Sequence, residues 1–196
     1  MKTAVEPRSN TKRKILDLTQ NLLLEKGYNG FSYKHISTQL GIKNAAVHYY
    51  FPTKEDLGVA IIQRVRRRFQ KWIHRSSIQE MNAWGKLDWF FSIYETYSAG
   101  GNRTCFLANL EAEFDTIPPF LQEEARALNA ELLDWLSHLV RSGRQQGAFI
   151  FEGTPENKAI IILASIQGAL QIARVTTYDS FKTSLQQIKS DLGYRP

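Results

Sequence analysis

The chain has 196 residues, 43% of them hydrophobic and 12% aromatic, with a formal net charge of +6 at pH 7. This composition suits a globular protein with enough apolar residues for a core, either one large domain or a small one joined to a medium one. A single cysteine excludes an intramolecular disulfide framework, and four dispersed histidines offer no metal-ligand spacing, so we expect no metal and no other cofactor.

The sequence also predicts a protein without a membrane partner. No segment has the roughly 18 consecutive apolar residues that a membrane span needs, and the first residues lack the apolar run of a signal peptide. We therefore expect a cytoplasmic location.

The positive charge is concentrated in the first part of the chain. Residues 1–75 hold 15 Lys and Arg against 5 Asp and Glu, whereas residues 76–196 hold 10 against 14. A basic segment alone is more often a solvated surface than a nucleic-acid site. It favours DNA binding only when a recognition motif lies in the same segment.

The first expected helix spans residues 11–26. Its aliphatic residues recur on one side, and Gly27 ends it. Residues 1–9 are polar and are expected to form a loose arm that could reach the backbone or minor groove of DNA. Tyr28 and Phe31 are expected to pack as core aromatics beneath the helix.

Residues 31–57 have the pattern of a helix-turn-helix. Ser32 can cap a short helix, and Gly41 suits the left-handed position that ends one. A second short helix, 44–50, follows after only a few residues, and such close spacing makes the two helices cross steeply. Pro52 ends the second helix, which in such a pair is the one that enters a DNA major groove.

The side chains of this second helix suit contacts with bases and phosphates. Ala45 and Ala46 are small, which lets the backbone approach base edges closely. The polar side chains that reach outward are Lys43, Asn44, His48, Tyr49 and Tyr50. Further phosphate contacts, which position a protein without reading sequence, are expected from Lys12, Arg13, Lys14, Lys34, Lys43 and Lys54.

A long helix is expected over residues 54–75. Thr53 and Asp56 form a capping-box-like start, and apolar residues at three- and four-residue steps predict a buried stripe. Four arginines are expected on a solvated or interdomain face rather than at bases: Arg64, Arg66, Arg67 and Arg68. A rod of about 30 Å can carry a displacement between domains, so we place the regulatory switch here.

The segment that follows the first short helix resembles the DNA-binding domain of the TetR family of transcriptional regulators. The matching residues are Gly41, Ile42, His48, Tyr49, Tyr50, Phe51, Pro52, Thr53 and Lys54, and the likeness extends over about residues 11–68. His48 departs from the family pattern, in which Tyr is commoner, but a histidine can still donate to a phosphate. The resemblance implies an all-α protein, with a three-helix DNA-binding domain at 1–75 and a larger helical effector-binding and dimerisation domain at 76–196.

The motif and the resemblance together predict which residues contact DNA. The expected base readers are Lys34, Lys43, Asn44, Ala45 and Ala46. The expected phosphate anchors are Tyr33, His48, Tyr49, Tyr50 and Lys54. Tyr33 and Lys34 are included because the corresponding family positions touch a phosphate and an edge base.

The central part of the chain is rich in large rings. We expect a break at 76–85, a helix at 87–99, a turn at 100–102 and a short helix at 104–114. The rings are equally consistent with the packed core of a helical domain and with the walls of a ligand pocket. The candidate pocket residues are Trp89, Phe90, Tyr94, Tyr97, Cys105, Asn109, Trp135, Gln167 and Arg174.

Cys105 has two interpretations. A lone cysteine is most often a buried small hydrophobe, and reactivity requires a lowered thiol pKa. However, the run from Cys105 through Asn109 to Glu113 resembles a Gly-Cys-aliphatic-Asn-Leu-Glu pattern in one branch of the TetR family, with Thr104 in place of Gly. Some members of that branch respond to electrophiles or oxidants, so a sensing cysteine is the alternative to an inert one.

Two long helices are expected at 119–147 and 155–177. Each has a continuous apolar seam that either packs within one protomer or pairs with its twin in a two-fold four-helix bundle. The resemblance favours the dimer, with Leu128, Leu132, Trp135, Leu139, Leu163, Ile166 and Leu170 at the interface. One short helix is expected within 178–196.

The function predicted from these features is a homodimeric repressor that a small-molecule, electrophilic or oxidising effector releases from a palindromic operator in double-stranded DNA. A TetR-like activator and a ligand-independent DNA-binding protein are the nearer alternatives. A helical enzyme is far less favoured, because no catalytic constellation has recognisable spacing.

Overall fold

The structure of the chain, a computed structural model, describes residues 8–99 and 105–195. The described part is helical and contains no strand. Its elements are α1 (Arg8–Lys26), α2 (Tyr33–Leu40), α3 (Asn44–Tyr50), α4 (Lys54–Ile73), α5 (Ser76–Gln79), α6 (Ala83–Ala99), α7 (Phe106–Ala112), a 3-10 turn η1 (Phe114–Thr116), α8 (Pro119–Gln145), α9 (Pro155–Val175) and α10 (Tyr178–Ser190). The expected all-α class is confirmed.

Three sequence expectations need adjustment. Helix α1 begins at Arg8, so any arm is shorter than 1–9, and residues 1–7 lie outside the described part. The turn expected at 100–102 also lies outside it. The expected break at 76–85 contains the short helix α5.

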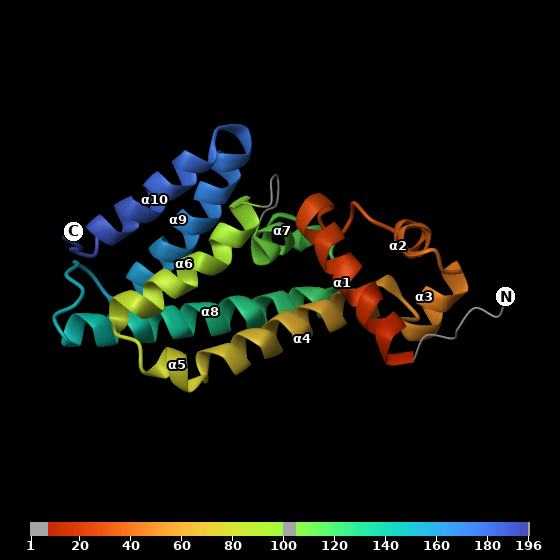
Figure 1. Cartoon of the computed structure of the whole chain (residues 1–196), viewed down its shortest axis with the longest axis horizontal. Helices are drawn as coiled ribbons and strands as arrows, with labels where there is room; N and C mark the ends of the chain where they lie inside the picture. The colour runs from red at the N-terminus through yellow and green to blue at the C-terminus, as the bar shows by residue number, and fades with distance from the viewer. Residues whose placement is uncertain (1–7, 100–104, 196) are drawn as a thin grey trace.

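The helices form two groups joined by α4 (Figure 1). Helices α1, α2 and α3 make a small unit at one end, and α5 to α10 make a larger body at the other. Helix α4 begins in the small unit and runs along α8 into the larger body. One continuous helix therefore belongs to both groups.

Local sequence explains the geometry of the small unit. Gly41 ends α2 in the left-handed region, with φ 63°, which costs little without a side chain. Thr53 and Asp56 form the expected reciprocal cap at the start of α4, with the Thr53 N–H donating to the Asp56 carboxylate at 2.9 Å. Ile36 and Val47 are fully buried between the short helices, which fixes their crossing.

The larger body packs around α8 and α9. These two helices lie together, and α10 covers α9. Helix α9 is long and apolar enough to cross a membrane by length and composition alone. One of its faces packs into the body, and the rest of the helix is not buried. Its opposite face is apolar and exposed, which bears on oligomerisation below.

Candidate DNA-contact surface and ligand pocket

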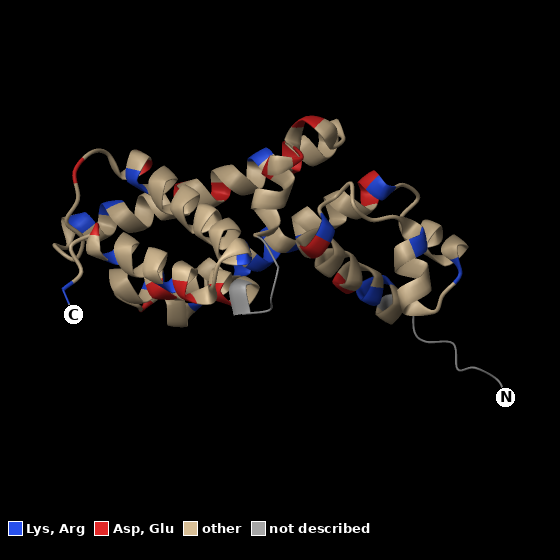
Figure 2. Cartoon of the chain, turned by 90° about the horizontal axis from the view of Figure 1, so that it is seen from above, with Lys and Arg blue, Asp and Glu red and all other residues tan. Residues whose placement is uncertain are grey.

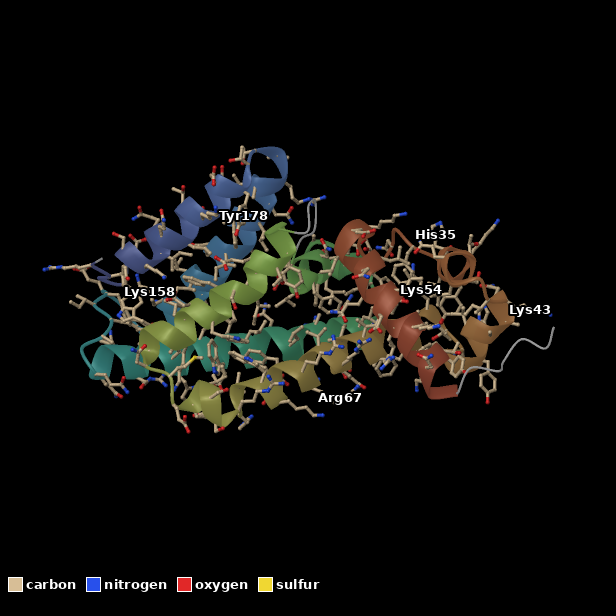
Figure 3. The ribbon with its side chains drawn as sticks, in the orientation of Figure 1. His35, Lys43, Lys54, Arg67, Lys158 and Tyr178 are labelled. Atoms are coloured by element: carbon tan, nitrogen blue, oxygen red, sulfur yellow. The ribbon has the colours of Figure 1, made fainter. Side chains whose placement is uncertain are left out.

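The surface of α3 that faces away from the body carries the predicted recognition residues. Lys43, Asn44, Ala45 and His48 are exposed, and Tyr49 is 66% exposed although it is a large aromatic residue. Ala46 and Tyr50 are partly exposed, and Lys34 is exposed on α2. Figure 3 shows Lys43 at the outer end of the molecule, and Figure 2 shows Lys and Arg on the helices of this small unit. The arrangement leaves a polar, partly basic helix face free for a DNA groove.

Tyr33 and Lys54, two of the expected phosphate anchors, point into the small unit instead. Tyr33 is buried, and its hydroxyl lies within hydrogen-bond distance of the Phe51 and Thr53 carbonyls, to one of which it donates. Burial is the first cause that raises the Tyr33 pKa. The Lys54 ammonium donates to the Phe31 carbonyl at 2.6 Å and lies over the Phe31 ring. Both side chains therefore hold α2 and α3 in place rather than extend to a phosphate.

His48 remains exposed but is partly committed. Its Nδ1 lies 3.1 Å from the Pro52 carbonyl, and its ring lies 4.6 Å from the Tyr33 ring. A carbonyl oxygen can only accept, so Nδ1 carries the proton in this geometry. In the neutral ring Nε2 is then an acceptor, and donation to a phosphate requires the doubly protonated ring.

A cavity of about 490 Å³ lies between α4, α6, α7 and α8, and Gln20 of α1 also lines it. Five of the predicted pocket residues line it: Trp89, Phe90, Tyr94, Tyr97 and Cys105. Its volume is in the range of small-molecule sites.

Helix α4 supplies a wall of this cavity that the sequence analysis did not assign to a pocket. Val65, Phe69 and Trp72 line it, together with Leu128 and Leu132 of α8. The sequence pattern that indicates this wall is the apolar stripe of α4, which continues beyond the small unit into the larger body.

Four predicted pocket residues do not line the cavity. Trp135 lies behind the wall, with its ring 5.2 Å from that of Phe90. Asn109 faces α1, where its amide donates to the Leu23 carbonyl at 2.7 Å. Gln167 is on α9, outside the lining, and Arg174 is exposed and donates to Gln171. Asn109, Gln167 and Arg174 are polar residues that the sequence suggested for a pocket, and helix packing directs them elsewhere.

Cys105 lies in the pocket wall as a protonated thiol. It is 5% exposed, and burial raises its pKa to about 11. Hydrogen bonds from the Leu107 and Ala108 backbone at the start of α7 act in the opposite direction but do not outweigh burial. The neighbouring Tyr94 also has a raised pKa, first because it is buried and then because of Cys105. A reactive cysteine needs a lowered pKa, so this environment favours the inert interpretation.

Helix α7 connects the pocket to the small unit. Cys105, Phe106 and Leu107, at its start, line the pocket. Glu113, at its end, accepts hydrogen bonds from the backbone N–H groups of Tyr28 at 2.5 Å and Asn29 at 3.1 Å. The first residues of α7 therefore contact the pocket, and the residue that follows its last turn contacts the small unit.

Gly27 makes this close contact possible. It has φ 73°, and a Cβ at this position would lie 2.7 Å from the Glu113 carboxylate. Asn109 adds a second connection by satisfying a carbonyl at the C-terminal end of α1. The motif residues Asn109 and Glu113 therefore join the two units.

Helix α4 is also joined to α8 by ionic contacts. The Arg66 guanidinium contacts Glu124 and Glu131, with N–O distances of 2.5 Å to each. These hydrogen bonds raise the pKa of Arg66, and that to Glu131 contributes most. Gln63 and Gln70, on the same side of α4, also donate to these two glutamates. One face of α4 is therefore fixed to α8, as the expected interdomain position of the arginines implied.

The expected dimer seam requires a correction. The structure buries six of its members within the protomer, at 8% exposure or less: Leu128, Leu132, Leu139, Leu163, Ile166 and Leu170. Trp135 is partly buried and packs edge-on against Phe69 at 6.0 Å. The seams therefore face the protomer's own core.

Another face of α9 is apolar and exposed. Ile161 is 59%, Ile172 54% and Val175 84% exposed. Ala164 is also exposed, and a Cβ on Gly168 would meet no other atom within 4 Å. Positions 161, 164, 168, 172 and 175 follow helical spacing and thus form one stripe, which we call the α9 outer stripe.

An exposed recognition helix on a small basic unit, connected by α4 and α7 to a helical body, defines a helix-turn-helix DNA-binding regulator. Comparison with known proteins agrees. Residues 15–61 match the family described as bacterial regulatory proteins, tetR family, and residues 83–185 match the tetracyclin repressor-like C-terminal domain. The chain belongs to the TetR family of transcriptional regulators.

Individual relatives extend over nearly the whole chain. An uncharacterized HTH-type transcriptional regulator from Lactococcus lactis subsp. lactis is 26% identical over 91% of this chain and 95% of its own length. A TetR-family regulator from Agrobacterium tumefaciens has a crystal structure with TM-score 0.88 and 27% identity, covering 95% of this chain and 99% of that one. For a TetR regulator from Legionella pneumophila the values are 0.82 and 26%, with coverage of 97% and 100%. The family and these relatives are transcriptional regulators, and homodimeric repressors are typical of the family.

Proposed function

We propose that this protein is a cytoplasmic, homodimeric repressor that binds a palindromic operator. A small molecule in the aromatic cavity of about 490 Å³ releases it from the operator. The observation that carries the proposal is the position of α7, which lines the pocket at Cys105 and bonds to the DNA-binding unit at Glu113. In this proposal residues 1–75 read DNA and residues 76–196 bind the effector and dimerise, with α4 shared between them.

The proposed base readers are Lys34, Lys43, Asn44, Ala45 and Ala46, and the proposed phosphate anchors are His48, Tyr49 and Tyr50. The ammonium of Lys43 is proposed to contact a phosphate as well. Their exposure supports this assignment. Tyr33 and Lys54 are assigned to internal support because their polar atoms bond within the small unit.

Dimerisation is proposed through the α9 outer stripe. Large exposed aliphatic side chains on one helix face favour burial against a partner, and small residues between them allow close approach of a second helix. A two-fold dimer presents two recognition helices and reads two half-sites, which extends the short sequence that one helix can specify.

Release is proposed to follow from differential binding. An effector that fits the pocket better when α4 and α7 are displaced stabilises that arrangement. The displacement changes the spacing of the two recognition helices, since α4 enters the DNA-binding unit and α7 is bonded to it. At saturating effector, DNA affinity then falls by at most the ratio of the effector's affinities for the two arrangements.

Two alternatives are less well supported. An electrophile or oxidant sensor requires an ionised thiol at Cys105, and the raised pKa opposes this. A protein that binds DNA without an effector would leave the aromatic pocket without a role, and activation instead of repression would follow from where the operator lies.

Selection from a pool of random duplex DNA at near-physiological salt tests the proposal. The expected product is a palindromic consensus with half-sites about one helical turn apart, or a multiple of that. Retention of duplexes without a shared sequence would favour an architectural role instead.

A further inference from the structure

Three cations line the edge of the pocket, in the last turns of α4 and just beyond its end. Arg68, Lys71 and Arg75 all line the cavity beside its aromatic walls. Arg68 and Lys71 are three residues apart on one side of α4, and Arg75 follows two residues after that helix ends at Ile73. We call these three residues the cationic rim.

The cationic rim is not balanced by acidic residues. Within residues 8–99 and 105–195, no Asp or Glu lines the cavity. Neighbouring arginines on α4 differ in this respect, because Arg64 pairs with Asp17 and Arg66 with two glutamates of α8. Arg68 instead donates to the neutral Gln20 amide at 3.4 Å.

The surroundings of Arg68 disfavour its charge. Burial lowers the Arg68 pKa most, and the Arg64 charge lowers it further, whereas Asp17 and Tyr97 act in the opposite direction. A negative charge brought into the pocket would oppose both lowering effects.

The rest of the cavity is suited to an apolar molecule. Trp72, Trp89, Phe90 and Tyr94 supply rings from α4 and α6, and Leu128 and Leu132 close the side formed by α8. Rings offer large contact areas to flat or aliphatic groups. A cationic ligand could also use these rings, but it would meet three like charges at the rim.

We propose that the effector of this pocket is an amphipathic anion, with an apolar body among the rings and a carboxylate or similar head group against Arg68 and Arg75. This inference rests on the proposed function, because it takes the pocket as the effector site. Guanidinium groups suit such a head group, since they can bond two oxygens of one anion in parallel.

The test uses two fluorescent probes that share one ring system. Anilinonaphthalene sulfonate is anionic, and N-phenylnaphthylamine lacks the sulfonate and is neutral. Both are titrated into the full chain, the double variant Arg68→Gln/Arg75→Gln, the variant Arg67→Gln and the variant Trp72→Ala. Arg67 is the matched control, because it is exposed on α4, does not line the cavity and points away from the body (Figure 3).

The deciding quantity is the ratio of the affinity for the anionic probe to the affinity for the neutral probe. We expect the double variant to lose about tenfold in affinity for the anionic probe, with little change for the neutral one, as for the removal of partly exposed charge-assisted contacts. Arg67→Gln should leave the ratio unchanged, and Trp72→Ala should weaken both probes. Raised salt should weaken only the anionic probe. Far-UV circular dichroism checks that each variant is folded.

Two results would overturn the inference: an unchanged ratio in the folded double variant, or no binding of either probe to the full chain. Selection of DNA by the same preparations separates this failure from failure of the proposed function. If a palindromic consensus is selected but the affinity ratio is unchanged, the proposed function stands and the proposal of an anionic effector fails. A fall in the ratio without any selected sequence supports the pocket chemistry and removes the proposed operator.

Discussion

Glu113 accepts a 2.5 Å hydrogen bond from the backbone N–H of Tyr28, 85 residues earlier in the chain. The acceptor is at the end of α7, whose first residues line the pocket, and the donor precedes the helix-turn-helix. The same carboxylate also accepts from Asn29. This contact is one connection between the proposed effector site and the DNA-binding unit, beside α4 and Gln20 of α1, which line the pocket directly.

Replacing Glu113 with Ala should loosen this connection. Two backbone N–H groups lose a charged acceptor, so we expect the free energy of unfolding to fall by about 1–2 kcal/mol, as for partly solvated charge-assisted bonds. Glu113→Gln keeps one acceptor oxygen and should lose less. Urea denaturation measures both, with exposed Glu123→Ala on α8 as the control. Equal free energies of unfolding for Glu113→Ala and the control would show that this contact does not stabilise the packing of α7 against the small unit.

The DNA-contact surface predicts different effects at two adjacent regions of α3. Tyr49→Ala removes an exposed ring and hydroxyl and should weaken binding to operator and random DNA alike, because phosphate contacts carry no sequence information. Asn44→Ala should also relax preference at one base pair, at a cost of about 1–3 kcal/mol there. Competition binding with single-base variants of the selected site measures this difference. Equal losses on operator and random DNA for both variants would contradict the assignment.

Lys43 and Lys54 should respond differently to removal of their charge. Lys43→Met should reduce the slope of log affinity against log salt by about 1, as for loss of one phosphate contact, and leave stability unchanged. Lys54→Met should leave the slope unchanged but lower stability, because the Lys54 ammonium bonds to the Phe31 carbonyl. Salt titrations and thermal unfolding test the pair. A reduced slope for Lys54→Met with wild-type stability would restore Lys54 as a phosphate anchor.

Cys105 should be unreactive in the folded protein. Its pKa rises from an ordinary 9.0 to about 11, so at pH 8 the ionised fraction falls about 100-fold. Iodoacetamide should therefore react at least about 100-fold more slowly with the folded chain than with the urea-unfolded chain. Comparable rates would return the electrophile sensor to consideration.

The same raised pKa of Cys105 predicts a sign for the dependence of stability on pH. Between pH 9 and about 11 the folded thiol keeps its proton while the unfolded thiol loses it. The folded state then binds more protons, so this contribution to stability is complete below pH 9 and is lost as pH rises through the folded pKa. Cys105→Ala should show a smaller fall in stability over this interval than the wild type.

The α9 outer stripe predicts the oligomeric state. Ile172→Glu should convert a dimer to a folded monomer, because the charge would be buried at the proposed interface. Ile150→Glu is the control, since Ile150 is 68% exposed but lies outside α9. Analytical ultracentrifugation measures the mass of each. A dimer that survives Ile172→Glu would exclude this stripe as the interface.

The fold was largely predictable because local signals agree with it. Gly41, Thr53 and Asp56 mark helix ends through their own backbone and side-chain chemistry, and the structure confirms these ends. Such signals depend on residues only a few positions apart. Four of the predicted pocket residues line the cavity because they are aromatic residues on one face of α6, a pattern that local sequence shows.

Long-range partners could not be predicted in the same way. Periodicity showed that Leu163 lies in an apolar seam but not whether the protomer or a partner buries it, and α9 has apolar residues on two sides. The hydroxyl of Tyr33 and the ammonium of Lys54 suggested phosphate contacts, but carbonyls distant in sequence use them. The role of Asn109 depends on a partner 86 residues away.

The central claim is that two copies of this chain read one palindromic site. The most direct measurement is the affinity for the selected duplex before and after insertion of five base pairs between the half-sites, with the stoichiometry determined in each case. The insertion rotates one half-site by about half a helical turn, so a rigid dimer can contact only one recognition sequence at a time. We expect two chains per original duplex and a loss of at least about 100-fold after insertion, as each half-site contributes several kcal/mol. Unchanged affinity after the insertion would contradict the claim.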